Sequence, residues 1–374
     1  MSNDDAVSER DLQRVVQTAA DELVGSGAET GLQVAVIHNG SVVVDVVSGL
    51  ADPTTGTPVT ADTLFYAVSA AKGVTSAVGH VLAERGDVDY DLRLAEVWPA
   101  FGSHGKEAVT LRHVLCHTAG VPGLPADTTV ADLCDWEHMC KVIADAEPWW
   151  EPGTRYGYHA QTFGFLLGET LRRVTGRGIS ALLRDHVTGP LGVGDDVLFG
   201  VSPDLLPRVA RQVAPEGPPP PLPDPDSPVG KAIPLGIAQN AEFANRRDVL
   251  TSDIPSGGTM TAAGVARMYA GLLGHIKGVT LVSKTRLELM AAITYRGTDE
   301  VMGVPAEWAL GYSPFRPGVG SRPGSTFGMV GSSGSVAYGD IDTGVAVAVM
   351  RNRFKAADFT AAERIDKLVS EAFG

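Results

Sequence analysis

Segments with β-strand character lie at both ends of this 374-residue chain, and helical patterns fill most of the sequence between them. Leu32–His38 and Ser41–Val47 are rich in valine, and Asn39-Gly40 between them is a strong hairpin signal because both residues tolerate positive φ. Gly328–Tyr338 and Gly344–Met350 predict two further strands near the C-terminus. Two separated β regions favour one shared sheet. We therefore expect an α+β fold, an antiparallel sheet flanked by helices with a large inserted helical subdomain.

Apolar residues recur at helical spacing along the rest of the chain. The pattern predicts helices over Ser8–Leu23, Ser69–Glu84, Leu111–His117, Leu133–Ala144, Gln161–Val174, Ile179–Val187, Ala262–Gly274 and Ala356–Phe373. We expect residues 1–66 and 280–374 to form the sheet subdomain, residues 67–279 to form the mainly helical one, and an active-site cleft between them. The proline-rich run 215–228 predicts a surface loop, which either rims the cleft as a lid or is a plain excursion.

The net charge of the chain restricts the classes of partner that it can bind. Asp and Glu number 44 against 30 Lys and Arg, a net charge of −14, which argues against binding to nucleic acid or to an anionic membrane surface. No stretch approaches the roughly 18 apolar residues of a membrane helix. The acidic, polar start lacks the features of an export signal. Cys116, Cys134 and Cys140 are then read as free thiols in a reducing compartment, so we expect a cytoplasmic protein.

Ser69-Ala70-Ala71-Lys72, at the start of a predicted helix, is the first candidate for chemistry. Residues three apart share a helix face, so the hydroxyl and the amine can meet. A partly buried lysine can be neutral and accept the hydroxyl proton, which activates the serine as a nucleophile. The alternative is a capping serine and a solvated lysine. A second copy of this spacing, Ser103-His104-Gly105-Lys106, lies in a polar stretch that we expect to be a loop.

Two other segments carry candidate groups. Pro152-Gly153-Thr154 predicts a turn, and Tyr156 and Tyr158 then lead into a helix. A tyrosine near a cationic lysine can have a lowered pKa and act as a base. The Gly- and Ser-rich segment Ser325–Ser335 allows close backbone approach, and its free N–H groups would serve as half of an oxyanion hole. The alternatives are a tyrosine packed at a helix start and a Gly-rich turn between strands.

Together with His117-Thr118-Ala119-Gly120, these motifs resemble the serine β-lactamase and penicillin-binding-protein superfamily, in particular the class C β-lactamase-like branch that includes family VIII carboxylesterases. The resemblance covers nearly the whole chain and implies a β-lactamase/transpeptidase-like fold. It implies that Ser69 is the nucleophile and Lys72 its base. It implies that Tyr158 relays the proton to the leaving group and later activates the acceptor, and that the backbone N–H groups of Ser69 and Ser332 form the oxyanion hole.

The chain departs from the family pattern at two places. The second family motif is commonly Tyr-x-Asn, but here it reads Tyr158-His159-Ala160, so the amide-binding Asn is absent and His159 is its partial replacement. The Lys-Thr-Gly strand reads Met329-Val330-Gly331, so the cation that would hold a β-lactam carboxylate is missing. Ser283–Arg286 is not the missing motif, because it lacks the glycine and leads into a helix. The departures argue against β-lactamase or D,D-peptidase activity and favour uncharged acyl donors.

We therefore predict a serine hydrolase or acyltransferase that forms an acyl-enzyme with small-molecule carboxylic esters. Water as acceptor makes it an esterase, and an amine or alcohol acceptor makes it a transacylase. The sequence leaves the donor, the acceptor and the oligomeric state open. A catalytically inactive binding or scaffold protein is the alternative from another class, and intact Ser69, Lys72 and Tyr158 argue against it. No cofactor is expected.

The remaining candidates concern the cleft and metals. Trp149-Trp150 either lines the cleft or packs under a loop. The substrate-binding candidates are His159, Trp150, Met329 and Gly331. Two groups lie close in sequence, namely His113, Cys116 and His117, and Cys134, His138 and Cys140. Neither group has the spacing of a common zinc site, so no metal is expected.

Overall fold

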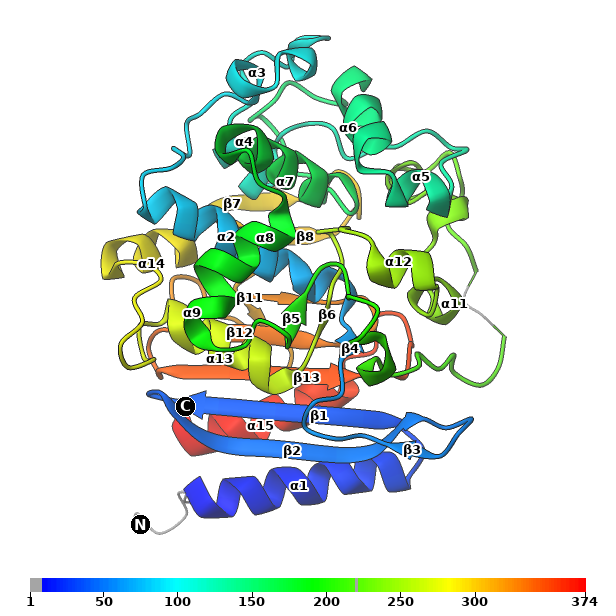
Figure 1. Cartoon of the computed structure of the whole chain (residues 1–374), viewed down its shortest axis with the longest axis vertical. Helices are drawn as coiled ribbons and strands as arrows, with labels where there is room; N and C mark the ends of the chain where they lie inside the picture. The colour runs from blue at the N-terminus through cyan, green and yellow to red at the C-terminus, as the bar shows by residue number, and fades with distance from the viewer. Residues whose placement is uncertain (1–8, 219–220) are drawn as a thin grey trace.

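A six-stranded antiparallel sheet crosses the lower half of the molecule in Figure 1, in the order β11-β12-β13-β1-β2-β3. The computed structural model describes residues 9–218 and 221–374. The strands of this sheet are β1 (Gly31–His38), β2 (Ser41–Asp52), β3 (Thr57–Pro58), β11 (Thr326–Val330), β12 (Val336–Asp340) and β13 (Val345–Arg351). They come from the two ends of the chain, so the antiparallel sheet predicted from the separated β regions is present.

Each central strand is apolar on both faces, because both faces of the sheet are covered. Along β13, valines 345, 347 and 349 face one core, and Ala346, Ala348 and Met350 face the other. This period of two is the pleat of a strand. Small alanines on the second face let a helix approach the sheet closely.

Helices cover the two faces of the sheet (Figure 1). Helices α1 (Glu9–Gly25) and α15 (Thr360–Phe373) pack side by side on the valine face. Helix α13 (Ala262–Leu272) packs on the alanine face, against β1, β12 and β13. Because α13 lies within the range 67–279, the division into two subdomains stays a prediction rather than a visible boundary.

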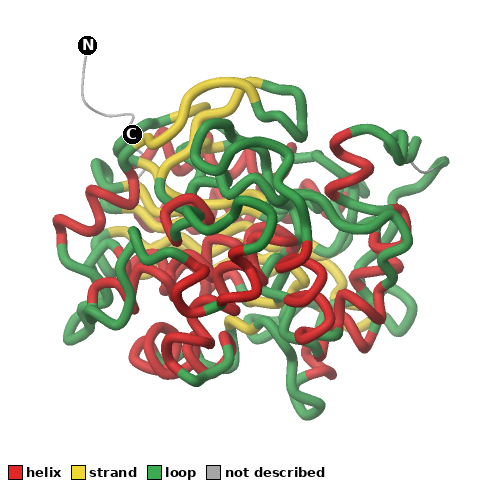
Figure 2. The backbone as a smooth tube through the Cα atoms, turned by 90° about the horizontal axis from the view of Figure 1, so that it is seen from above, coloured by secondary structure: helices red, strands yellow, loops and turns green. Residues whose placement is uncertain are grey.

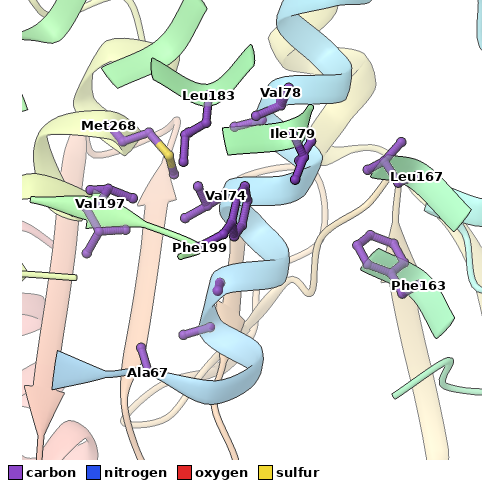
Figure 3. Packing of buried hydrophobic residues seen from close by; sticks show 14 of the residues in the cluster. Ala67, Val74, Val78, Phe163, Leu167, Ile179, Leu183, Val197, Phe199 and Met268 are labelled. Atoms are coloured by element: carbon purple, nitrogen blue, oxygen red, sulfur yellow. The ribbon is translucent and has the colours of Figure 1, made fainter. Parts of the chain in front are cut away.

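Helix α2 (Ala71–Glu84) lies at the centre of the upper part of the molecule. All of its residues from Ala71 to Ala83 are buried. Figure 3 shows Val74 and Val78 of α2 surrounded by apolar side chains from α7, α8, β5 and α13. Close packing on every side fixes the position of each side chain that α2 carries.

The other helices have between 3 and 14 residues. They are α3 (Leu94–Val97), α4 (Leu111–Leu115), α5 (Val130–Cys134), α6 (Trp136–Asp145), α7 (Thr162–Thr175), α8 (Ile179–Leu183), α9 (Gly189–Leu191), α10 (Pro228–Ala232), α11 (Ala241–Ala244), α12 (Arg247–Thr251) and α14 (Lys284–Ala291). Long loops join them (Figure 2), in keeping with the 44 glycines and 24 prolines of the chain.

Smaller sheets complete the fold. Strands β4 (Phe65–Tyr66), β6 (Thr259–Met260) and β5 (Val197–Leu198) form a three-stranded sheet, and β7 (Ile293–Thr298) pairs with β8 (Pro305–Ala309). Strands β9 (Phe315–Arg316) and β10 (Gly320–Ser321) form another pair. None of these strands was predicted from the sequence, because such short strands give a weak periodic pattern.

Three sequence predictions of elements need correction. The single strand expected over Gly328–Tyr338 is two antiparallel strands, β11 and β12, joined by a turn at residues 331–335, because Gly334 at φ 96° reverses the chain. The helix expected over Leu133–Ala144 is two helices, α5 and α6, and Asp135 between them caps the second. The helix expected from Ala356 begins only at Thr360.

Residues 1–8 lie outside the described residues. They include Ser8, the first residue of a predicted helix, and most of the segment on which the export-signal argument rests. Within 9–218 and 221–374, no helix combines the length and the apolar character that crossing a bilayer requires. Cytoplasmic location stays a prediction.

Candidate active site

Ser69 lies in a single 3-10 turn, Val68–Ala70, that leads directly into α2. The turn is held in an unusual conformation, because Val68 has a φ of 50° although it is β-branched. Burial of the whole turn and the hydrogen bond from Ala67 N–H to the carbonyl of Gly258 (2.8 Å) compensate for this strain. The turn presents the Ser69 side chain at the N-terminal end of α2, with 8% of the residue exposed.

Lys72 lies one turn further along α2 and is fully buried. Its Nζ is 3.0 Å from Ser69 Oγ and donates a hydrogen bond to the carbonyl of Ser256, also at 3.0 Å. Burial lowers the pKa of Lys72 to about 7. A large share of the amine is therefore neutral near pH 7, and a neutral amine can accept the serine proton.

Tyr158 lies in an irregular segment that leads into α7, as expected from the sequence. Its backbone N–H donates to Asp299 Oδ1 (3.1 Å), and its ring centroid is 5.1 Å from Lys72 Nζ. Burial raises the pKa of Tyr158, and a hydrogen bond with Ser69 opposes that rise. The expected lowering of this pKa was therefore wrong in direction, because desolvation disfavours the phenolate. Tyr158 is a neutral phenol at pH 7 that can donate its proton.

The His117–Gly120 segment packs against the segment that carries Tyr158. His117 has a φ of 54°, and its ring centroid is 4.8 Å from that of Tyr158. His117 Nδ1 accepts a hydrogen bond from the backbone N–H of His159 (3.0 Å). These contacts hold the segment that carries Tyr158 against the end of α4.

The His159 side chain is occupied by backbone groups. Its Nε2 accepts from Val121 N–H (3.1 Å), and its Nδ1 lies 2.6 Å from the carbonyl of Gly157. Both ring nitrogens therefore have partners, and the residue is 1% exposed. The sequence predicts that His159 contacts substrate in place of the absent motif Asn. Such a contact would compete with these backbone hydrogen bonds, and it stays a prediction.

Strand β11 lies beside the serine turn, as an oxyanion hole requires. A Cβ placed on Gly331 would lie 2.3 Å from the carbonyl oxygen of Ala67, so a glycine is needed for this approach. Ser332 follows Gly331 in the turn between β11 and β12. The N–H groups of Ser69 and Ser332 as oxyanion donors stay a prediction, favoured by this close approach.

Met329 lies on β11 in the position of the missing lysine. It is 3% exposed and clusters with Tyr156 and Trp308, and Tyr158 packs against the same cluster. The side chain thus offers an apolar surface beside Tyr158.

The two neighbouring tryptophans have different surroundings. Trp150 is buried with Ala232 and Val301, and its Nε1 donates to the carbonyl of Thr118. Trp149 is 38% exposed and lines a cavity of about 560 Å³ together with Pro225 of the proline-rich loop. Trp150 packs beneath a loop, so its contact with substrate stays a prediction. The loop does border a cavity.

Three residues of the site were missed by the sequence analysis. The carbonyl of Ser256 accepts from Lys72, Asp299 accepts from the backbone of Tyr158, and Trp308 packs against Tyr158. They are separated from their partners by more than a hundred positions in the sequence. No local spacing signals such contacts.

The two motifs that the sequence argued against, Ser103–Lys106 and Ser283–Arg286, have other hydrogen-bond partners. Ser103 Oγ and Lys106 Nζ donate to the carbonyls of Ala144 and Ala146 rather than to each other. Ser283 caps α14. Among residues 9–218 and 221–374, no group of three or more His, Cys, Asp and Glu side chains is arranged to hold a metal ion. All three cysteines are free thiols.

The chain is similar to several known proteins. A family model described as Beta-lactamase matches residues 16–370. The Esterase/beta-lactamase LipL of Mycobacterium tuberculosis is 35% identical over 348 residues, which cover 86% of this chain and 77% of that protein. A solved family VIII carboxylesterase is 30% identical, with a TM-score of 0.83 over 95% of this chain and 97% of its own. A penicillin-binding protein homolog from Caulobacter crescentus is 31% identical, with a TM-score of 0.85 over 97% of each chain.

Proposed function

The chain belongs to the β-lactamase family, and on that premise we propose that it hydrolyses small, uncharged carboxylic esters through an acyl-enzyme on Ser69. The observation that carries the proposal is the 3.0 Å contact between Lys72 Nζ and Ser69 Oγ inside a buried site. A nucleophile, a base whose pKa lies near 7 and a neutral tyrosine donor then lie within reach of one another. Such a set is what acyl transfer at neutral pH requires.

The reaction begins as neutral Lys72 takes the proton of Ser69 and Oγ attacks the ester carbonyl carbon. The N–H groups of Ser69 and Ser332 receive the negative charge on the carbonyl oxygen. Tyr158 gives its proton to the leaving alkoxide, and Lys72 returns a proton to Tyr158. A water molecule then attacks the acyl-enzyme and passes its proton back through the same two residues. Ser69 regains its proton as the carboxylic acid leaves.

The substrate class follows from the apolar cluster on β11. A substrate carboxylate placed beside Met329, Tyr156 and Trp308 would be desolvated against apolar side chains, which is costly. The name of the Mycobacterium tuberculosis relative joins esterase and β-lactamase. For this chain, the apolar Met329 favours the ester.

The acceptor is tested together with the donor. An acyl-enzyme can be resolved by water, an amine or an alcohol, so transacylation needs only an acceptor that competes with water. After incubation with ester, with or without hydroxylamine or methanol, intact-protein mass spectrometry detects the acyl-enzyme, and mass spectrometry of the small molecules in solution detects the product. A product formed only with an added acceptor would replace hydrolysis by transacylation.

Ser69→Ala tests the nucleophile. We expect p-nitrophenyl butyrate turnover to fall by roughly 10³-fold or more, as for nucleophiles in other acyl-enzyme systems. Fluorophosphonate labelling of the variant should disappear. Ser103→Ala is the matched control and should keep full activity, because Ser103 bonds to a backbone carbonyl away from Lys72. Ser69→Ala turnover within about tenfold of the wild type, about 1.4 kcal/mol of barrier, would remove Ser69 from the mechanism. An unlabelled, inactive wild type would instead indicate a binding protein.

A further inference from the structure

The turn that carries Ser332 is hydrogen-bonded to the end of β13 and to the segment that follows β13. Ser332 accepts a hydrogen bond at its carbonyl from Ala357 N–H (2.9 Å). Ser335 Oγ, at the other end of the turn, accepts from the backbone N–H of Arg351 (3.3 Å). Within the turn, Gly334 N–H donates to the carbonyl of Gly331 (2.8 Å). The turn is thus fastened at both ends to the segment 351–358.

Arg351 fixes the shape of that segment. It is fully buried, and its Nη1 donates to the carbonyl of Asp358 (2.7 Å). Its Nε is 3.1 Å from Glu29 Oε2, and Glu29 is itself 4% exposed. Arg351 therefore bridges the start of β1, the end of β13 and the start of α15.

The contact between Arg351 and the turn is close. A Cβ placed on Gly334 would lie 2.5 Å from Arg351 Nη1 and 2.4 Å from the carbonyl oxygen of Asp358. Ala357, which donates to Ser332, has a φ of 56°, a conformation that a residue other than glycine adopts only when its surroundings impose it. Contacts with the Arg351 guanidinium and with Ala357 therefore restrict the position of the turn.

We propose that Arg351, fixed by its hydrogen bond to the carbonyl of Asp358 and by its close contact with Glu29, is a positioning residue that holds the Ser332 N–H at the oxyanion hole. The inference rests on the proposed function, since it assigns Arg351 to the same acyl-transfer site. Arg351 touches no reacting atom and acts through the backbone of the 331–335 turn. A displacement of an oxyanion donor by about 1 Å can cost about 100-fold in rate, so a fully buried side chain behind the turn can control catalysis.

The test is Arg351→Lys, which keeps the charge but not the forked contact with Asp358 and Glu29. We expect kcat for p-nitrophenyl butyrate to fall about 10- to 100-fold per folded molecule, with little change in KM. The inhibition constant of phenylboronic acid, which forms a tetrahedral adduct with a serine, should rise by a similar factor. Glu29→Gln is a near-isosteric second variant that removes the carboxylate, and it should change both readouts in the same direction.

Arg316→Lys is the matched control. Arg316 is also a buried arginine, but it contacts Asp340 and Asp366 rather than the 331–335 turn. We expect it to lower thermal stability and to leave kcat per folded molecule unchanged. Equal losses of kcat in the Arg351, Glu29 and Arg316 variants would overturn the inference, because a general structural effect would then explain them. Unchanged kcat in folded Arg351→Lys and Glu29→Gln would also overturn it. A wild type that is not acylated would overturn the proposed function as well.

Discussion

Lys72 differs from a surface lysine because α2 is enclosed by packed side chains. Transfer of an ammonium group from water into that interior disfavours the charged form, and this desolvation lowers its pKa to about 7. The same burial raises the pKa of Tyr158. Burial thus suits the two residues to their proposed roles, a lysine base and a protonated tyrosine donor.

The pH dependence of kcat/KM tests this division. Lys72 accepts a proton only when it is neutral, so we expect kcat/KM for p-nitrophenyl butyrate to rise with pH and to level off above about 7. An ordinary lysine, with a pKa of about 10.4, would place the rise three units higher. Burial lowers the pKa of His159 to about 4 and lowers the pKa of His117, so neither of these imidazoles titrates near 7. A rise centred above pH 9 would contradict a lysine base with a lowered pKa.

Met329→Lys tests substrate choice at a single side chain. We expect the ratio of nitrocefin to p-nitrophenyl butyrate turnover to increase, because the new cation can pair with a carboxylate. The variant should also be less stable than the wild type, because the position is 3% exposed and lined by Tyr156 and Trp308. Met329→Leu is the control, since a volume-conserving apolar change should leave the ratio unchanged. Comparable wild-type turnover of nitrocefin and the ester would contradict the role of Met329.

At the scale of elements, the site depends on the approach of β11 to the turn before α2. The two elements come from positions more than 250 residues apart, and only a residue without a side chain fits between their backbones at Gly331. The atoms that a side chain would meet belong to the backbone of Ala67 and Ala70, which cannot rotate away. The distance across the site is therefore set by backbone contact.

Gly331→Ala should separate these two elements. We expect a kcat loss of about 100-fold, because the oxyanion donors on either side move apart, together with a lower thermal midpoint. Gly25→Ala is the control, because a Cβ at this exposed end of α1 meets nothing within 4 Å. The measurements are ester kinetics and thermal unfolding of both variants. Wild-type kinetics in Gly331→Ala would show that the strand can yield, and the oxyanion assignment would lose its support.

Sequence patterns located several elements well and others poorly. Asn39-Gly40 located the β1–β2 hairpin, and apolar spacing located α1, α2, α7 and α13. Patterns failed at Gly328–Tyr338, where one strand was expected in place of β11 and β12, because no proline or charged residue marks the turn between the two short apolar runs. They also failed at β7 and β8, which are short and contain a glycine, a proline and charged residues. A turn that is fixed by tertiary packing has little signature in the local sequence.

At the scale of the whole molecule, one large core joins the sheet to the helical region. It includes Ala35 and Ile37 of β1, Met350 of β13 and the apolar side chains of α2 and α7. A second core lies between the valine face of the sheet, α1 and α15. The family and the α+β fold that the motifs predicted are confirmed by the matches to the β-lactamase family and to solved relatives.

The shared core leads us to expect a single unfolding transition. Four of the five tryptophans, Trp98, Trp136, Trp149 and Trp150, lie in the helical middle of the chain, whereas far-UV circular dichroism reports on all elements. Urea unfolding followed by tryptophan fluorescence and by circular dichroism should therefore give coincident curves. Two separated transitions would show instead that residues 67–279 unfold independently of the sheet, as a division into two subdomains would allow.

Local chemistry in the sequence determined the choice of reacting groups, because the Ser69–Lys72 pairing needs only one turn of helix and the Tyr158 motif lies in one short segment. The tertiary structure decided what those groups can do. The pKa of Lys72 depends on packing from α7, α8 and α13. Ser256 positions Lys72, and Asp299 positions Tyr158. Arg351 positions Ser332. Hydrogen bonds within one helical turn are set by backbone geometry, whereas burial and contacts between distant segments exist only once the whole chain has packed.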